Sequence, residues 1–476
     1  MSLEGAIAAN RFGLGARPGE IARASANPKA WLMDQMNGPA PVFTRPDGQP
    51  FANAQKLVDD EDAFKVQKFM GKGNKKALKE AANQQKGEKG EKDPLQKMEQ
   101  QILVTPNGNI RKEEYAEEMH ARFALGFTTD RPFAERLVRF WSNHFTVAGR
   151  GNKVSLFAGD FEREAIRPYV SGNFEDMLFA VVMHPAMQIY LDNWHSFGPN
   201  SPSGKNRDKG LNENLGRELM ELHTLGVDGG YTQADVTAMA KLLTGWGVYA
   251  GRANGFGFYQ ERHEPGRITL RGKTYPAGYD GGVAAIRDLA HDPATARNLA
   301  RKFATHFISD APPKESVARL EKVFRDTHGN LHALTETIVN DPAAWASEQN
   351  KMRTPVEYVT AAIRLTGWSG GNDREPGARK MVAAVRVMGE VPFGAPSPKG
   401  WPDNADAWNG ADAMLSRVQW ARNFSNTLPA SLNASAAAEM GLGPQLRPAT
   451  KSAMAGASSQ SEAFALLLAS PEFQRR

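Results

Sequence analysis

Hydrophobic side chains return every three or four positions over most of this chain, which is the spacing of an amphipathic helix. The pattern is clearest between about 111 and 246 and between about 282 and 366. One stripe consists of Phe133, Leu137 and Trp141. Strand patterns do not alternate with helix patterns, so a parallel sheet is not expected. The predicted fold class is therefore mainly α, with many helices around a single core.

Local start signals mark two of these helices. The tripeptide at 130–132 (Asp-Arg-Pro) predicts a helix whose N-cap is Asp130 and whose first turn contains the proline. Further along, Thr232 and Asp235 have the spacing of a capping box. The sequence thus indicates where both helices begin.

One segment departs from helical spacing toward strand spacing. Short alternating runs near 255–275 predict a small β-hairpin excursion, with its turn at 264–266 (Glu-Pro-Gly). His263 and Glu264 would then lie at an exposed tip, unless this loop folds inward.

Other segments lack any regular pattern. Residues 38–60 and 391–410 are rich in Pro, Gly or Trp and predict long irregular loops. An Ala/Ser-rich stretch from about 430 to 460 is expected to be flanked by two final helices. With no internal repeat, the 476 residues are predicted to form one helical unit over 1–476.

The amino-acid composition excludes several kinds of functional site. The chain has no cysteine, which excludes disulfides, thiolate metal sites and cysteine nucleophiles. Its formal charge is +5, but eight Lys face only four acidic residues between Lys72 and Met98, so this segment alone carries +4. The segment has almost nothing to bury, so 72–98 is predicted to be a solvated insertion and no nucleic-acid partner is expected.

Neither a leader nor a membrane span is expected. Residues 1–15 have no basic n-region, carry Glu4, and break their only apolar run at Asn10 and Arg11. No 18 apolar residues follow one another in the chain. The sequence as written therefore predicts a cytoplasmic protein, and a trimmed leader would leave no trace in it.

A carboxylate is expected on the apolar face of one helix. On a wheel of 100° per residue, Glu218 falls inside the leucine stripe of residues 211–226, and Asn214 and Glu221 lie at its edge. A buried carboxylate must be paired, metal-bound or protonated. Two interpretations stay open: an internal ion pair with an arginine such as Arg217 or Arg139, or a catalytic or ligand-binding group.

Further polar groups occupy inward or capping positions. His144 shares the inward face of Leu137 and Trp141, either as a satisfied core histidine or, with Asn143, in a polar pocket. Asp192 and Asn193 end a helix and could cap it or bind a ligand.

Several long motifs resemble a known family. They closely resemble the bacterial family called domain of unknown function 1800, nearly from end to end, and they occupy residues 140–147, 185–193, 210–236, 242–246, 262–266 and 470–476. The resemblance implies no established activity. It does imply frequent export, so a periplasmic or exported location is the alternative to the cytoplasmic one expected from the sequence as written. It also implies frequent gene neighbourhood with a sulfatase/phosphatase-like superfamily protein, which is a candidate partner. The chain has Glu264 where the family usually has Asp, and this change keeps a carboxylate.

The motif positions most able to do chemistry coincide largely with the inward polar groups. The resemblance marks Asn143, His144, Asp192, Asn193, Asn214, Arg217, Glu218, Glu221 and His263.

These residues lead to two hypotheses. In the first, the protein is a hydrolase or lyase acting on a polymer or a phosphate or sulfate ester. His144, Glu218, Glu221 and His263 are then catalytic, the other five bind substrate, and no metal or cofactor is assigned. In the second, the protein is a non-catalytic binding or assembly protein whose polar residues form a structural network. The first hypothesis expects His144 within about 8 Å of Glu218 or Glu221, beside a solvent path.

Overall fold

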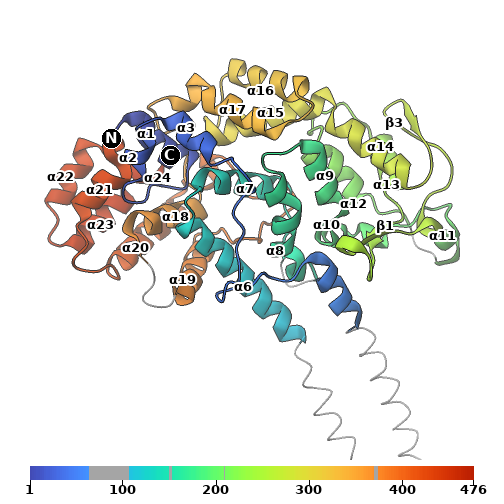
Figure 1. The fold of residues 1–476 in the computed structure, drawn as a ribbon, viewed down its shortest axis with the longest axis horizontal. Coiled ribbons are helices and arrows are strands. Elements are labelled where there is room, and N and C mark those ends of the chain that lie inside the picture. The colour runs from blue at the N-terminus through green and yellow to red at the C-terminus, as the bar shows by residue number, and fades with distance from the viewer. Residues whose placement is uncertain (64–106, 150–152, 208–209, 369–373) are drawn as a thin grey trace, which may run out of the picture.

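The computed structural model describes residues 1–63, 107–149, 153–207, 210–368 and 374–476. The predicted mainly α fold is confirmed: helices make up most of these residues, and the strands form two small two-stranded antiparallel sheets. Figure 1 shows the helices arranged along an arc, with α21–α23 (red) beside α1 and α2 (blue) at one end. The two ends of the chain therefore pack together. The Lys-rich stretch at 72–98 lies outside the described residues.

The N-terminal half consists mostly of short helices. Before the first undescribed segment the elements are α1 (Leu3–Ile7), the π-helical η1 (Ala8–Phe12), α2 (Glu20–Ala24), α3 (Pro28–Asp34) and a helix at 54–63. After it come α6 (Asn107–Thr128), α7 (Pro132–His144), η2 (Lys153–Phe157), α8 (Ala158–Phe161), the π-helical η3 (Glu162–Ile166), η4 (Arg167–Tyr169), α9 (Phe174–Met183), α10 (Pro185–Tyr190), η5 (Asn193–His195), α11 (Pro202–Arg207), α12 (Asn214–Glu218), the π-helical η6 (Leu219–His223) and α13 (Gln233–Leu242).

Two antiparallel pairs follow α13. Strand β1 (Trp246–Val248) pairs with β2 (Phe256–Phe258), and β3 (Ile268–Leu270) pairs with β4 (Lys273–Tyr275). The helical turns η7 (Ala253–Gly255) and η8 (Gln260–Arg262) accompany β2. The β excursion is thus present, but the turn of the second hairpin is at 271–272, where both residues have positive φ, and not at 264–266.

The C-terminal half is helical again. It consists of α14 (Tyr279–Ala290), α15 (Pro293–Phe307), α16 (Lys314–Asp326), α17 (Leu331–Asn340), η9 (Pro342–Trp345), α18 (Pro355–Thr366), α19 (Arg374–Val387), η10 (Ala405–Ala407), α20 (Ala411–Ser425), α21 (Ala434–Leu442), η11 (Gly443–Gln445), α22 (Pro448–Ala455), α23 (Gln460–Ala469) and α24 (Pro471–Gln474).

Three local predictions need correction. The Ala/Ser-rich stretch itself contains α21 and α22, because alanine is the strongest helix former and Asn433 caps the first of them. The expected loop at 38–60 gives way to a helix at residue 54. The N-cap of α7 is Arg131, without a side-chain cap, while Asp130 pairs with Arg17. The capping box of α13 is confirmed.

Buried apolar side chains form two large clusters. The first includes α7, α9, α13 and α15, and the second includes α18, α20, α21 and α23 with part of α6. Buried ion pairs connect helices across the molecule: Arg364 on α18 donates to both oxygens of Glu20 on α2, at 2.8 and 2.9 Å. Arg136 on α7 likewise pairs with Glu357 on α18.

Candidate functional site

A cavity of about 830 Å³ lies between the end of α7, η6, α15, the first turn of α18 and the loop at 390–404. Two predicted motifs meet there, because Asn143 and His144 at the end of α7 and Glu221 on η6 all line it. The lining also contains several Arg and Lys side chains, which place positive charge in a wall that is otherwise mostly apolar.

Asn143 attaches the 390–404 loop to α7. Its amide nitrogen donates to the carbonyl of Trp401 at 2.9 Å, and its Oδ1 accepts from the N–H of Trp401 at 2.7 Å. Trp401 also contacts the buried Trp408, which follows the loop: their ring centroids are 6.1 Å apart. Asn143 therefore shapes one wall of the cavity.

His144 uses both ring nitrogens within the protein. Its Nε2 lies 3.1 Å from the carbonyl of His223, and its Nδ1 lies 3.2 Å from Nζ of Lys302. A carbonyl can only accept, so Nε2 carries the proton and Nδ1 accepts from the lysine. Burial, followed by the charge of Lys302, holds the pKa of His144 well below its usual value. A neutral His144 thus positions the lysine.

Lys302, whose Nζ contacts His144, is a positively charged side chain at the cavity wall. Its Nζ also donates to the carbonyl of Leu222, at 3.1 Å. Burial and the nearby charges of Arg301 and Lys399 lower the pKa of Lys302 to about 8. All three cations line the cavity, and among the described residues no carboxylate lies within 4.0 Å of their nitrogens. Lys302 is partly buried, whereas Arg301 and Lys399 are exposed. Such a group of positive charges without an acidic partner favours the binding of an anion.

Most other charged groups of the lining are paired with one another. Glu162 accepts from Arg122 at 2.6 Å, and Arg167 also pairs with it. Glu357 pairs with Arg136, and Asp403 accepts from His306 at 2.8 Å. Such groups hold the walls in place, because a buried charge that already has its partner is poorly available to a ligand.

Two carboxyl groups of the lining differ from these. Glu221 is half-buried, and no side chain in the described part of the protein forms an ion pair or hydrogen bond with it. Glu390 is buried and accepts from the N–H of Val356 at 2.7 Å. Burial raises the pKa of Glu390 to about 7, so this carboxyl group is poised to exchange a proton near neutral pH.

Glu218 does not occupy the buried position that the helical wheel predicts. It is half-buried and outside the cavity lining, while Arg217 pairs with Glu213 at 3.2 Å and Asn214 is exposed. The wheel assumed one regular helix over 211–226. The α-helix instead begins at Asn214 and changes to π-helical geometry at 219–223, which alters the angle between successive side chains. Burial and the charge of Glu221 raise the pKa of Glu218.

The remaining predicted residues contact other parts of the fold. Asn193 is buried and donates to the carbonyls of Leu243 and Trp246, and Asp192 pairs with the exposed His195 at 2.9 Å. His263 is buried and does not lie at an exposed tip. Its Nδ1 donates to the carbonyl of Thr244 at 2.8 Å, and its Nε2 accepts from Gly278 at 2.7 Å.

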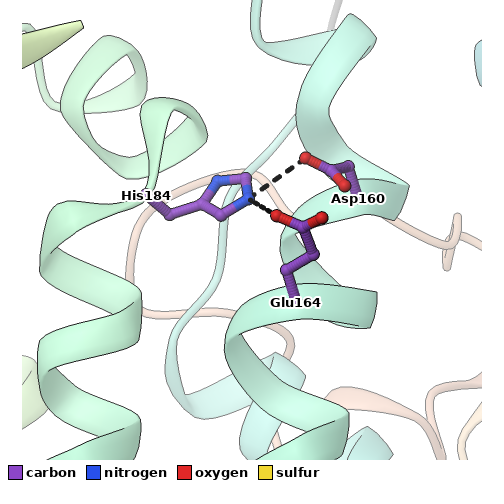
Figure 2. Close-up of side chains that lie close together, drawn as sticks. All are labelled: Asp160, Glu164 and His184. Carbon is purple, nitrogen blue, oxygen red and sulfur yellow. Dashed lines mark ion pairs between the residues drawn. The ribbon is translucent and has the colours of Figure 1, made fainter. Parts of the chain in front are cut away.

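A second polar group was not predicted from the sequence. Asp160 on α8, Glu164 on η3 and His184, the N-cap of α10, point toward one another, and one ligand atom of each lies within 4.8 Å of the others (Figure 2). Nε2 of His184 is 3.2 Å from Oδ2 of Asp160 and 4.0 Å from Oε2 of Glu164. This is a donor set that could hold a metal ion. None of the three residues lines the cavity.

The family comparison gives a clear assignment. The profile described as "Protein of unknown function (DUF1800)" matches residues 7–475. The chain belongs to the DUF1800 family. Searches of curated proteins and of solved structures found no match. No described helix of this DUF1800 protein is long and apolar enough to cross a membrane.

Sequence reasoning missed the cations of this DUF1800 site for a physical reason. Asn298, Lys302 and His306 recur at i+4 spacing on α15, and this polar stripe was a usable signal. Nothing in the sequence shows that it faces His144 or that Lys399 joins it, because those contacts connect segments about 100 residues or more apart.

Proposed function

We propose that this DUF1800 protein is a hydrolase or lyase acting on a phosphate or sulfate ester, either as a small molecule or within an anionic polymer, and that the 830 Å³ cavity is its active site. The observation that carries the proposal is the convergence of Arg301, Lys302 and Lys399 without an acidic partner among the described residues. An ester anion would supply the missing negative charge.

The carboxyl groups of the cavity would transfer the protons. Glu221, half-buried and unpaired by the described side chains, would deprotonate the attacking water or the substrate. Glu390, with its pKa raised to about 7 by burial, would protonate the leaving group. His144 and Asn143 position Lys302 and the loop at 390–404. This proposal gives no catalytic role to Glu218 or His263, which lie outside the lining.

The competing proposal is a non-catalytic protein that binds an anion in the same cavity or uses these residues for assembly. The ion pairs of Glu162, Glu357 and Asp403 support it, because they show that many charged groups of the lining serve the fold. The neutral His144, with both nitrogens engaged, supports it as well.

Partner and compartment remain proposals. A sulfatase/phosphatase-like superfamily protein, expected from the family resemblance, would handle ligands of the same chemical class. Export likewise rests on the resemblance alone.

Measuring substrate turnover distinguishes the proposed enzyme from the proposed non-catalytic binding protein. The full chain would be screened against aryl phosphates, aryl sulfates and sulfated or uronate polymers, together with Glu221→Gln, Lys302→Met and the exposed control Lys314→Met. Loss of turnover in the first two variants and retention in the control is the expected result. Turnover unaffected by Glu221→Gln and Lys302→Met would overturn this active site, and sulfate binding without any turnover would favour the binding protein.

A further inference from the structure

We propose that Asp160, Glu164 and His184 form a binding site for a divalent transition-metal cation. Figure 2 shows the imidazole of His184 directed between the two carboxylates, which come from successive turns of the segment 158–166. The site is separate from the cavity, so the inference does not rest on the proposed function.

Asp160 provides the first argument. Its side chain is 0% exposed, and neither carboxylate oxygen accepts a hydrogen bond from any described residue. The nearest basic nitrogens are Nε2 of His184, at 3.2 Å, and Nη2 of Arg163, at 3.5 Å. Buried carboxylates are rarely left without hydrogen bonds, so the two oxygens of Asp160 are available to a bound cation.

The local charge provides the second argument. Glu118 is also buried there and pairs with Arg163, so one guanidinium faces three carboxylates: Glu118, Asp160 and Glu164. The three carboxyl groups outnumber the one guanidinium by two, so a divalent cation would add positive charge to an acidic group.

The donor set indicates the class of cation. Two carboxylate oxygens and one imidazole nitrogen suit Zn²⁺ or Mn²⁺ better than a cation that prefers oxygen alone. Glu164, with 33% of its side chain exposed, provides access from solvent. The same helical segment carries Glu162 on the cavity wall, so a bound cation would stabilise this wall.

The hydrogen bond between His184 and the Ala186 amide makes the proposal testable. Nδ1 of His184 accepts from the N–H of Ala186 at 3.1 Å, which places the ring proton on Nε2 in the metal-free protein. A metal on Nε2 must displace that proton, and a neutral metal-bound ring then carries a proton on Nδ1. Binding should therefore take the hydrogen-bond acceptor away from the Ala186 amide.

The chelator-treated full chain would be titrated with Zn²⁺ and with Mn²⁺ by calorimetry. The rate of hydrogen exchange at the Ala186 amide would be measured with and without the metal. We expect one ion per chain, a higher melting temperature, faster exchange at Ala186, and affinity weakened about tenfold or more in Asp160→Asn and His184→Ala. Asp160→Asn removes a buried charge and should fold without metal.

The exposed pair Asp192–His195, at 2.9 Å, gives matched controls, Asp192→Asn and His195→Ala, which should bind as the wild type does. No stoichiometric binding, or affinity unchanged in Asp160→Asn and His184→Ala, would overturn the metal site. The proposed active site would be untouched by that outcome.

Discussion

Nζ of Lys302 lies 3.2 Å from Nδ1 of His144, at the wall of a cavity that Glu221 also lines. The lysine is held by neutral acceptors, the imidazole and the carbonyl of Leu222, and no carboxylate of the described residues forms an ion pair with it. The sequence predicted a catalytic role for His144 and no role for Lys302. In the proposed function His144 positions Lys302, and Lys302 contacts the anion.

Anion binding should weaken as pH rises. The pKa of Lys302 is lowered to about 8, so its charge is present at neutral pH and lost above that value, while arginine stays protonated. Sulfate is the appropriate probe, because it does not titrate in this range. Calorimetric titration between about pH 7.5 and 9.5, above the pKa of about 7 that burial gives Glu390, should show affinity falling through pH 8 in the wild type and a nearly flat profile in Lys302→Met. A flat wild-type profile would show that Lys302 does not contact the anion.

Glu390→Gln should stabilise the protein at alkaline pH. The folded-state pKa of Glu390, about 7, lies above its ordinary 4.5, so the group's contribution is favourable at low pH and is lost as pH rises through 7. Urea unfolding should give similar stabilities near pH 4.5 and a gain of roughly 1–3 kcal/mol for the variant near pH 8. The exposed Glu336→Gln is the control. A variant that is less stable near pH 8 would contradict the burial of this carboxyl group.

Glu357→Gln should destabilise the protein strongly. The carboxylate pairs with Arg136 and, at 3.2 Å, with Arg476, and both guanidinium groups are buried. Removing the negative charge leaves them uncompensated, which costs about 3–5 kcal/mol. Urea unfolding at neutral pH measures this loss. The exposed pair Glu439–Lys451 provides the comparison, where Glu439→Gln should cost less than about 1 kcal/mol. Equal losses in the two variants would contradict the account.

Glu218→Gln and Glu218→Lys should have similar stability. A fully buried Glu218 would make the lysine variant worse by several kcal/mol, but the side chain is half-buried beside Glu221. We therefore expect denaturation midpoints that differ by about 1 kcal/mol or less. A much larger penalty for lysine would place Glu218 in the core and restore the helical-wheel interpretation.

How much of the structure could be predicted from the sequence depends on how far apart in the chain the interacting residues lie. The inward orientation of His144 and the capping box of Thr232 depend on regular helices and local spacing, and both were predicted. The prediction that Glu218 is buried was wrong, because the π-helical turn after it is not signalled by hydrophobic spacing. Lys399 reaches the cavity, and His184 reaches Asp160, only through tertiary packing. No local pattern encodes those contacts.

Sulfate binding to the cation group at the cavity tests the central claim most directly. The wild type, Lys302→Met, Lys399→Met and the exposed control Lys314→Met would be titrated with sulfate at about pH 7 and low ionic strength, where screening is weak. The account predicts one sulfate per chain, with affinity weakened about tenfold by Lys302→Met, weakened less by the exposed Lys399→Met, and unchanged by Lys314→Met. Sulfate affinity that is the same in all four proteins would contradict an anion site in this cavity.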